Sequence, residues 1–488
     1  MNEEQTRRHV ERLLGVIKRI QPDKKYKWDD QGLSSAFGAL HANFCRYNQT
    51  AKEWFVYSGK VWEIDPGGIR TAEYVKAFIT AMRMYAITLD DEQQSYDSFI
   101  KKYGQYTSRE HLMKDARSVN HFVTLDLDRN ADLFNCKNGT LNLRTGQFRK
   151  HNPTDLLSRI SNVQYDKTAS SEVFEKFISE IMQNDQQKID YLQKILGYAL
   201  TADPCWETCW FLYGATTRNG KGTLCETIGY MMGGTKGYAN TAQPETLAQK
   251  DKKDSSKPSE DLARLNGCRF LNVSEPPKRM LLDAALFKQL TGKDTITARF
   301  LNQNSFEFTP CFKLFINTNY LPIISDDTVF SSDRINVITF DRHFSQQERD
   351  RALKQKLRKE RNISGAFNWC FEGLKRFMRE GAEPPESVRN ATESYRKSCD
   401  KIGKFISDTL IVNPNKCIAA GSVYDLYKVW CRDAGYGTES KGNFFEDLKS
   451  RGIFQSSGTV NGKTVRNVVA GFEKPYDTTD CGDDVQNV

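Results

Sequence analysis

The sequence predicts an α/β core around a phosphate-binding loop, preceded by an α+β domain and a helical collar and followed by a winged helix. Three observations support this fold class. WFLYGATTRNGKGTLCETIGYMM reads as a strand, a glycine-bearing loop and a helix. Short apolar runs alternate with helical segments from Pro204 to Phe344, as in an α/β sheet. Near the C-terminus, three helical segments precede two strands joined at Asn461-Gly462.

Size and composition exclude several classes of protein. The 488 residues suggest about three domains, and 39% of them are hydrophobic. No run of about 18 apolar residues could cross a bilayer, and the N-terminus MNEEQTRRHVERLLGVIKRI predicts a charged helix instead of a secretory signal. Twelve scattered cysteines indicate reduced thiols. The net charge of +8 is compatible with a polyanionic partner.

Composition changes along the chain predict six segments. The first contains a hairpin around Ser58-Gly59, a helical stretch to Val119, and a strand at 140–143 between two turns. Helical spacing of apolar residues indicates the collar. The expected segments are an N-terminal domain at 1–170, the collar at 171–203, the P-loop domain at 204–345, a helical region and linker at 346–399, the winged helix at 400–472, and an acidic, disordered tail at 473–488.

The glycine-bearing loop is the strongest chemical signal. Its backbone N–H groups can surround phosphates at a helix N-terminus, and Lys221 can reach the β- and γ-phosphates. It departs from the usual pattern because Ala215 occupies the first-glycine position and Gly222 the hydroxyl position, so Thr223 becomes the magnesium candidate. A simple glycine turn is the structural alternative. The expected nucleotide-binding residues are Gly214, Ala215, Asn219, Gly220, Lys221, Gly222 and Thr223.

Three later segments add candidates for the same chemistry. CRFLNVSEPP is an apolar strand that ends in Glu275, a carboxylate suited to holding magnesium or polarising water. CFKLFINTNYLP ends in Asn317 and Asn319, of which Asn319 is better placed to bind a γ-phosphate or a water, unless it only caps the strand. Arg334 precedes the next strand and suits a finger reaching a neighbouring subunit, with a surface salt bridge as the alternative.

Five ordered blocks carry a family resemblance: GATTRNGKGT, LARLNGCRFLNVSEP, LFKQLTGKDTITARF, FEFTPCFKLFINTNYLP and DRINVITF. They resemble the superfamily 3 helicase core of phage, plasmid and poxvirus-type primase-helicases. The resemblance implies an AAA+-like hexameric ring that binds ATP and Mg²⁺ and threads one DNA strand, with 3′ to 5′ travel. By motif, Lys221 and Thr223 would be Walker A, Glu275 Walker B, Asn319 sensor 1, and Arg334 the trans-acting finger.

The resemblance also implies a pore hairpin within TITARFLNQNSFEF, with its tip near 302–305. The tip departs from the basic sequence commonly expected for gripping phosphates, so contact falls to neighbouring cations or amides. Roles at subunit contacts are the alternative for each of them. The candidates for DNA binding are Lys288, Lys293, Arg299, Asn302 and Gln303. The winged helix could contact either DNA or protein.

A primase activity is not expected. Asp29-Asp30, Asp90-Asp91-Glu92 and TLDLD at 124–128 lack the histidine-containing context that a two-metal site of this kind needs. The expected protein is therefore a replicative DNA helicase of a phage, prophage, plasmid or genomic island in a bacterial cytoplasm. Its expected partners are single-stranded and forked DNA, its own copies, and a possible separate primase, polymerase or initiator, with no membrane.

Two rival functions are compatible with the same motifs. A nucleotide kinase can also carry GKGT, although it gives no role to the segment from Lys288 to Arg299. An origin-binding or assembly factor could use ATP only as a switch. Strand displacement distinguishes a helicase from both.

Overall fold

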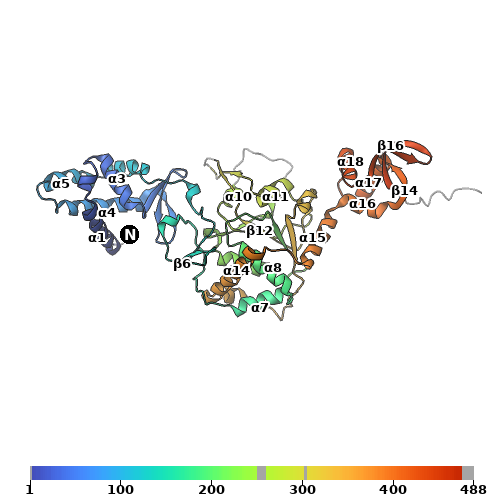
Figure 1. Ribbon diagram of the computed structural model, residues 1–488, viewed down its shortest axis with the longest axis horizontal. Coiled ribbons are helices and arrows are strands. Elements are labelled where there is room, and N and C mark those ends of the chain that lie inside the picture. The colour runs from blue at the N-terminus through green and yellow to red at the C-terminus, as the bar shows by residue number, and fades with distance from the viewer. Residues whose placement is uncertain (1–2, 250–259, 300, 302–304, 475–488) are drawn as a thin grey trace, which may run out of the picture.

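The computed structural model describes residues 3–249, 260–299, 301 and 305–474. Figure 1 shows an N-terminal unit at one end, a central unit that contains β12, and a C-terminal unit at the other end. None of the helices within the described ranges is long and apolar enough to cross a membrane. The predicted acidic tail lies mostly outside the described residues, because they end at Lys474.

A five-stranded parallel sheet forms the middle of the central unit. Its strands lie in the order β13-β7-β12-β9-β8. Ile316 on β12 pairs with Phe211 on β7 and with Val273 on β9, so the three central strands are in register. The strand bounds are β7 Cys209–Tyr213, β8 Ala239–Ala242, β9 Phe270–Ser274, β12 Lys313–Thr318 and β13 Ile335–Thr339.

Alternate residues of these strands supply two hydrophobic cores, because successive side chains of a strand point to opposite faces. Trp210 and Phe315 stack with ring centroids 5.1 Å apart on the face covered by α7, α8, α9 and α14. Phe211 and Ile316 lie on the other face, against α11 and α15. The helix bounds are α7 Glu172–Ile181, α8 Gln186–Tyr198, α9 Lys221–Met231, α11 Ala284–Thr291, α14 Glu360–Glu380 and α15 Glu386–Cys399.

The helices predicted for the collar are present, and they pack against a helix distant in sequence. A Cβ atom on Gly197 of α8 would lie 2.2 Å from the backbone nitrogen of Leu374, and one on Gly373 of α14 would lie 2.0 Å from the carbonyl oxygen of Gln193. The two helix backbones are therefore in direct contact at a pair of glycines. Beyond α14, Ala382 is fully buried, and α15 packs against β13 through Tyr395, so the predicted linker region is a turn and a packed helix.

Short elements complete the central unit. They are α10 Glu260–Ala263, α12 Thr328–Ser331, α13 Leu353–Leu357, and the antiparallel strands β10 Ile296–Ala298 and β11 Phe306–Phe308. β10 and β11 form the two sides of the expected hairpin, whose residues 302–304 lie outside the described residues.

The N-terminal unit packs helices against a three-stranded antiparallel sheet. The predicted turn at Ser58-Gly59 joins β2 to β3, and Gly59 has φ +95°, which glycine adopts without strain. Its elements are α1 Glu3–Ile20, α2 Pro22–Lys25, α3 Asp30–His41, β1 Cys45–Asn48, β2 Glu53–Tyr57, β3 Trp62–Asp65, α4 Ile69–Ala86, α5 Gln93–Lys101 and α6 Tyr106–Asp115.

A second small sheet joins this unit to the central one. β5 Gly139–Asn142 corresponds to the predicted strand, and it lies between β4 Leu133–Cys136 and β6 Phe148–Arg149. Phe134 of β4 lies 4.8 Å from the ring of Tyr238 and 5.1 Å from that of Phe367, both in the central unit. The side chain of Asn135 accepts from His151 and donates to the carbonyl oxygens of Lys60 and Arg159. This sheet therefore belongs to the core of the central unit.

The C-terminal unit contains the predicted helices and the predicted two-stranded hairpin, together with a strand that the sequence did not predict. The extra strand, β14, contains Pro414, which argues against a strand in a sequence-based prediction. The structure accommodates this proline at a register shift between Val412 and Cys417. The elements are α16 Lys401–Thr409, β14 Ile411–Ala419, α17 Ala420–Ala434, α18 Lys441–Ser450, β15 Phe454–Val460 and β16 Lys463–Glu473, with the sheet order β14-β16-β15.

Two buried cations connect the C-terminal end of α8 to the first residues of two central strands. Arg269 donates to the carbonyl oxygens of Leu200 and Leu133, each at 2.8 Å. Lys313 donates to the carbonyl oxygen of Thr201 at 2.7 Å, and its ammonium lies 4.3 Å from the ring centroid of Tyr198. Cations are favourable at this end of a helix, where the carbonyl groups carry partial negative charge.

Burial lowers the pKa of Lys313 to about 7. An unfolded lysine keeps its proton up to about pH 10.4, so between these two values the unfolded chain binds more protons than the folded one. Folding is therefore penalised most below pH 7, and stability increases as the pH rises from about 7 to 10.

Replacing Lys313 with methionine should remove this dependence. Lys313→Met should destabilise the protein more at pH 9 than at pH 6, with the difference growing by up to about 1 kcal/mol per pH unit. Urea unfolding of both proteins across this range provides the measurement. A difference that does not change with pH would mean that Lys313 keeps an ordinary pKa in the folded chain.

Candidate functional site

The loop at 214–220 leaves the carboxyl end of β7 and enters α9. The Gly214 N–H donates to the carbonyl oxygen of Thr318 at the end of β12, with N and O 3.2 Å apart. Gly220 stands at the N-cap of α9 with φ +84°. The strand, loop and helix therefore follow one another as the sequence predicts, and the first N–H groups of α9 point toward the loop.

Lys221 lies in the first turn of α9, and its ammonium faces this loop. Nζ donates to Oδ1 of Asn219 at 2.7 Å and to Oδ1 of Asn319 at 2.8 Å. The residue is only 4% exposed. Burial lowers the pKa of Lys221 to about 8, while Cys225 and Glu275 oppose this lowering. The structure thus brings together three residues that the sequence placed in separate motifs.

Two glycines are required by close contacts in this loop. A Cβ atom on Gly214 would lie 2.0 Å from the side-chain nitrogen of Asn219 and 2.8 Å from Nζ of Lys221. One on Gly220 would lie 2.4 Å from Cγ2 of Ile181 in α7. The second contact means that the loop rests directly on the collar helix. Ala215, by contrast, is exposed.

Glu275 follows β9 directly, one strand away from the loop. Its N–H donates to the carbonyl oxygen of Asn317 at 2.8 Å, and its φ is +56°, an unusual value for a residue with a side chain. Its side chain is exposed. Asn317 is buried on β12, and a Cβ atom on Gly222 would lie 3.9 Å from its amide nitrogen. Glu275 and both asparagines are therefore at the edge of the sheet that holds Lys221.

Thr223 and Glu275 supply oxygen donors of the kind that magnesium prefers. Magnesium usually takes one or two protein ligands and completes its shell with phosphate oxygens and water. Thr223 is half-buried in the first turn of α9, about 100° around the helix from Gly222. Glu275 is close enough to influence the pKa of Lys221. The donor set fits the ion.

Arg334 lies at the opposite edge of the sheet. It precedes β13, whereas Lys221 follows the carboxyl end of the neighbouring strand β7. Five residues of strand separate the two edges by about 15 Å, too far for Arg334 to reach a phosphate at Lys221 of the same subunit. Its Nη2 lies 2.5 Å from Oε2 of Glu207. The salt bridge that the sequence left open as an alternative is thus present.

The candidates for DNA binding occupy different environments. Lys288 is paired with Asp326 at 2.6 Å, so its charge already has a partner. Lys293 is exposed, and Arg299 is half-buried after β10. Asn302 and Gln303 lie outside the described residues.

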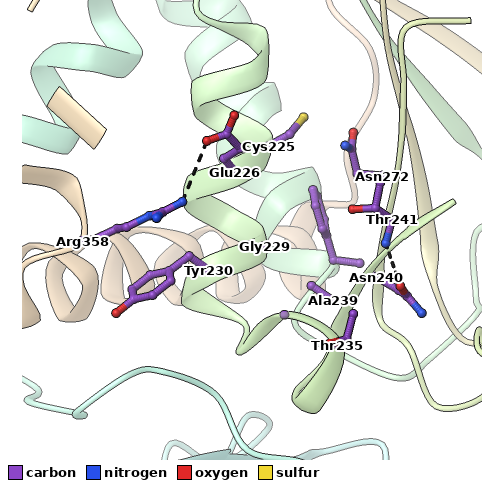
Figure 2. A pocket seen from close by; sticks show the side chains of 12 residues that line it. Cys225, Glu226, Gly229, Tyr230, Thr235, Ala239, Asn240, Thr241, Asn272 and Arg358 are labelled. Carbon is purple, nitrogen blue, oxygen red and sulfur yellow. Dashed lines mark hydrogen bonds and ion pairs between the residues drawn. The ribbon is translucent and has the colours of Figure 1, made fainter. Parts of the chain in front are cut away.

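A pocket of about 290 Å³ lies beside the later turns of α9 and was not anticipated from the sequence (Figure 2). Its lining includes Tyr230, Asn272 and Arg358. Arg358 packs over the Tyr230 ring at 5.0 Å and forms an ion pair with Glu226 at 3.8 Å. Tyr230 lies nine residues beyond Lys221, about 13 Å along the helix, so this pocket is separate from the edge that holds Lys221.

Two family models match parts of the chain. Residues 34–183 match the family described as D5 N terminal like. Residues 212–334 match a family of unknown function, DUF5906. The second range contains the 214–220 loop, Glu275, Asn319 and Arg334.

Viral proteins are similar to a large part of the chain. A protein named as a helicase candidate in Acanthamoeba polyphaga mimivirus is 27% identical over 68% of this chain and 36% of its own length. A similarly named protein of Invertebrate iridescent virus 3 is 26% identical over 67% and 38%, respectively. The chain thus spans little more than a third of these relatives. A solved structure, the apo C-terminal region of NrS-1, aligns over 88% of this chain and 96% of its own, with a TM-score of 0.47 and 12% identity.

Adding a methyl group at Gly220 should destabilise the loop. Gly220→Ala would force alanine to φ +84° and press it against Ile181, so it should cost about 1 kcal/mol or more. Gly229→Ala is the matched control, because Gly229 is in the same helix with no atom within 4 Å of the added carbon. Thermal unfolding should show a lower midpoint for the first variant only. Equal midpoints would mean that the loop does not hold this conformation.

Proposed function

Because this chain belongs to the phage and viral family of superfamily 3-type primase-helicases, we propose that it is an ATP-hydrolysing DNA helicase for replication of a mobile element. The observation that carries the proposal is the position of Lys221. Its buried ammonium faces the loop between Asn219 and Asn319, and Glu275 follows the adjacent β9. These are the groups that phosphoryl transfer to water requires.

In this proposal the 214–220 loop binds the phosphates of ATP. The N–H groups at the start of α9 favour an anion. Lys221 now donates to two amide oxygens, which a phosphate oxygen can replace with a stronger, charged acceptor. An anion beside Lys221 also raises its pKa from about 8, so ATP binding favours the charged lysine.

Asn319 and Glu275 act on the attacking water. The amide of Asn319, released from Lys221, orients the water, and the exposed carboxylate of Glu275 polarises it. Thr223 and Glu275 would hold magnesium, which when bound neutralises charge on the phosphate oxygens.

The proposed assembly is a hexameric ring with one ATP site at each subunit boundary. Arg334 cannot reach its own subunit's Lys221, so it would act on the nucleotide of a neighbour. The hairpin of β10 and β11 would face a single DNA strand, with Lys293, Arg299, Asn302 and Gln303 as its contacts. Lys288 would support this segment through Asp326. Travel from 3′ to 5′ is what the family implies.

Two alternatives give different results in an unwinding assay. A nucleotide kinase would transfer phosphate to a nucleotide and would need no DNA. An ATP-switched initiation factor would bind DNA and hydrolyse ATP without separating strands. A partner primase, polymerase or initiator, and a bacterial host, remain part of the proposal.

Unwinding of a forked duplex should depend on Lys221 and Arg334. We expect the wild type to separate forks with one tail polarity, and Lys221→Ala and Arg334→Ala to separate neither polarity. Lys375→Ala is the control, because Lys375 pairs only with Glu372 on the surface of α14. Hydrolysis of ATP without strand separation by the wild type would favour the switch factor.

Mixing the two inactive variants tests the shared site. An equal mixture of Lys221→Ala and Arg334→Ala subunits should regain about a quarter of the wild-type ATPase sites, because some boundaries then combine an intact lysine with an intact arginine. No recovery in rings that demonstrably exchange subunits would rule out a trans-acting Arg334.

We also propose that the C-terminal unit is a winged helix that contacts duplex DNA. Its order of elements, α16-β14-α17-α18-β15-β16, is that of a winged helix. Lys441, Lys463 and Arg466 are exposed and form no ion pair with other described residues. They lie at the start of α18 and along the β15-β16 hairpin, where that fold meets DNA.

Replacing the two cations of the hairpin should weaken duplex binding. Lys463→Ala with Arg466→Ala should lower affinity and reduce the salt dependence of binding by about two phosphate contacts. The matched double variant, Lys416→Ala with Lys428→Ala, removes lysines already paired with Glu473 and Asp425. Fluorescence anisotropy with a duplex at several salt concentrations provides the measurement. Equal losses in both double variants would indicate a protein-docking role instead.

A further inference from the structure

Arg334 is enclosed by acceptors of its own subunit. Besides the ion pair with Glu207, its Nη1 donates to the carbonyl oxygen of Lys288 at 3.4 Å and to Oγ1 of Thr291 at 3.3 Å. Its side chain is 18% exposed. An arginine held in this way cannot at the same time bind a phosphate on another subunit.

Of these three contacts, only Glu207 holds the arginine strongly. The bonds to Lys288 and Thr291 are long and involve neutral acceptors, and such bonds are weak. The bond to Glu207 is short and joins opposite charges. The Glu207 side chain is 40% exposed, so solvent or a neighbouring subunit can reach the carboxylate.

Glu207 is also attached to the collar. The preceding residue, Trp206, packs against Phe377 of α14 with ring centroids 4.9 Å apart, and its N–H donates to the hydroxyl of Tyr198 of α8 at 3.0 Å. The following residue, Thr208, donates to the carbonyl oxygen of Asp333, next to Arg334. A shift of the collar relative to the sheet would therefore move the carboxylate relative to the guanidinium.

We propose that Glu207 is a positioning residue that retains Arg334 within its own subunit and releases it when the neighbouring subunit binds ATP. The proposal rests on the trans-acting role of Arg334 given above. In the free subunit, the ion pair competes with the finger position. A bound triphosphate carries more negative charge than one carboxylate, so it shifts the arginine toward the neighbour. ATP binding and subunit contact are thereby coupled.

The test compares Glu207→Gln with the wild type in the full chain. Glutamine keeps the shape and an acceptor but removes the charge, so less ATP is needed to draw Arg334 across. The KM for ATP should fall about two- to fivefold, the loss expected for a partly exposed ion pair, while kcat is retained. The protein concentration that gives half-maximal ATPase activity should fall as well. Glu372→Gln, which removes a surface ion pair on α14, is the matched control.

The outcomes separate this proposal from the one beneath it. Unchanged KM and assembly midpoint in Glu207→Gln, with Arg334→Ala inactive, would leave the finger in place and refute retention by Glu207. Equal losses of kcat and thermal stability in Glu207→Gln, with no change in KM, would assign it a structural role. Wild-type ATPase in Arg334→Ala would overturn the trans-acting finger itself.

Discussion

Burial of the central strands on both faces confines the chemistry of the central unit to the two ends of its sheet. All six residues of β12 are buried, and so are four of the five residues of β7 and β9. Functional side chains must then come from positions where a strand begins or ends. The carboxyl edge holds Lys221, Glu275 and Asn319. The amino edge holds cations only, at Arg269, Lys313 and Arg334.

These two edges use their charges differently. Arg269 and Lys313 donate to carbonyl groups at the end of α8 and fix the helical layer against the sheet. Arg334 is at the equivalent place on the next strand, but its acceptor is the half-exposed Glu207. At the other edge, Gly220 rests on Ile181 of α7. The collar thus contacts both edges, and a change at the nucleotide loop has a short physical route to Glu207.

Local patterns were enough to predict Lys221, Glu275 and Asn319, because each follows an apolar strand and parallel strands end at one edge. The same reasoning did not reveal Glu207, which lies 127 residues from Arg334 in an irregular segment with no periodicity. It also gave no sign of Arg269 and Lys313 as core residues, since charged side chains are almost always exposed. β14 was missed because a proline interrupts it. Long-range packing, as between Phe134 and Phe367, has no local signal at all.

The glycine crossing of α8 and α14 has a mechanical consequence. With no layer of side chains between them, the two helices cannot slide by changing rotamers, so they translate and rotate as one rigid lever. Trp206 lies near one end of this lever and the loop-bearing α7 near the other. Any side chain larger than hydrogen at either glycine would act as a wedge, and evolutionary drift at Gly197 and Gly373 should be narrower than anywhere else along these two helices.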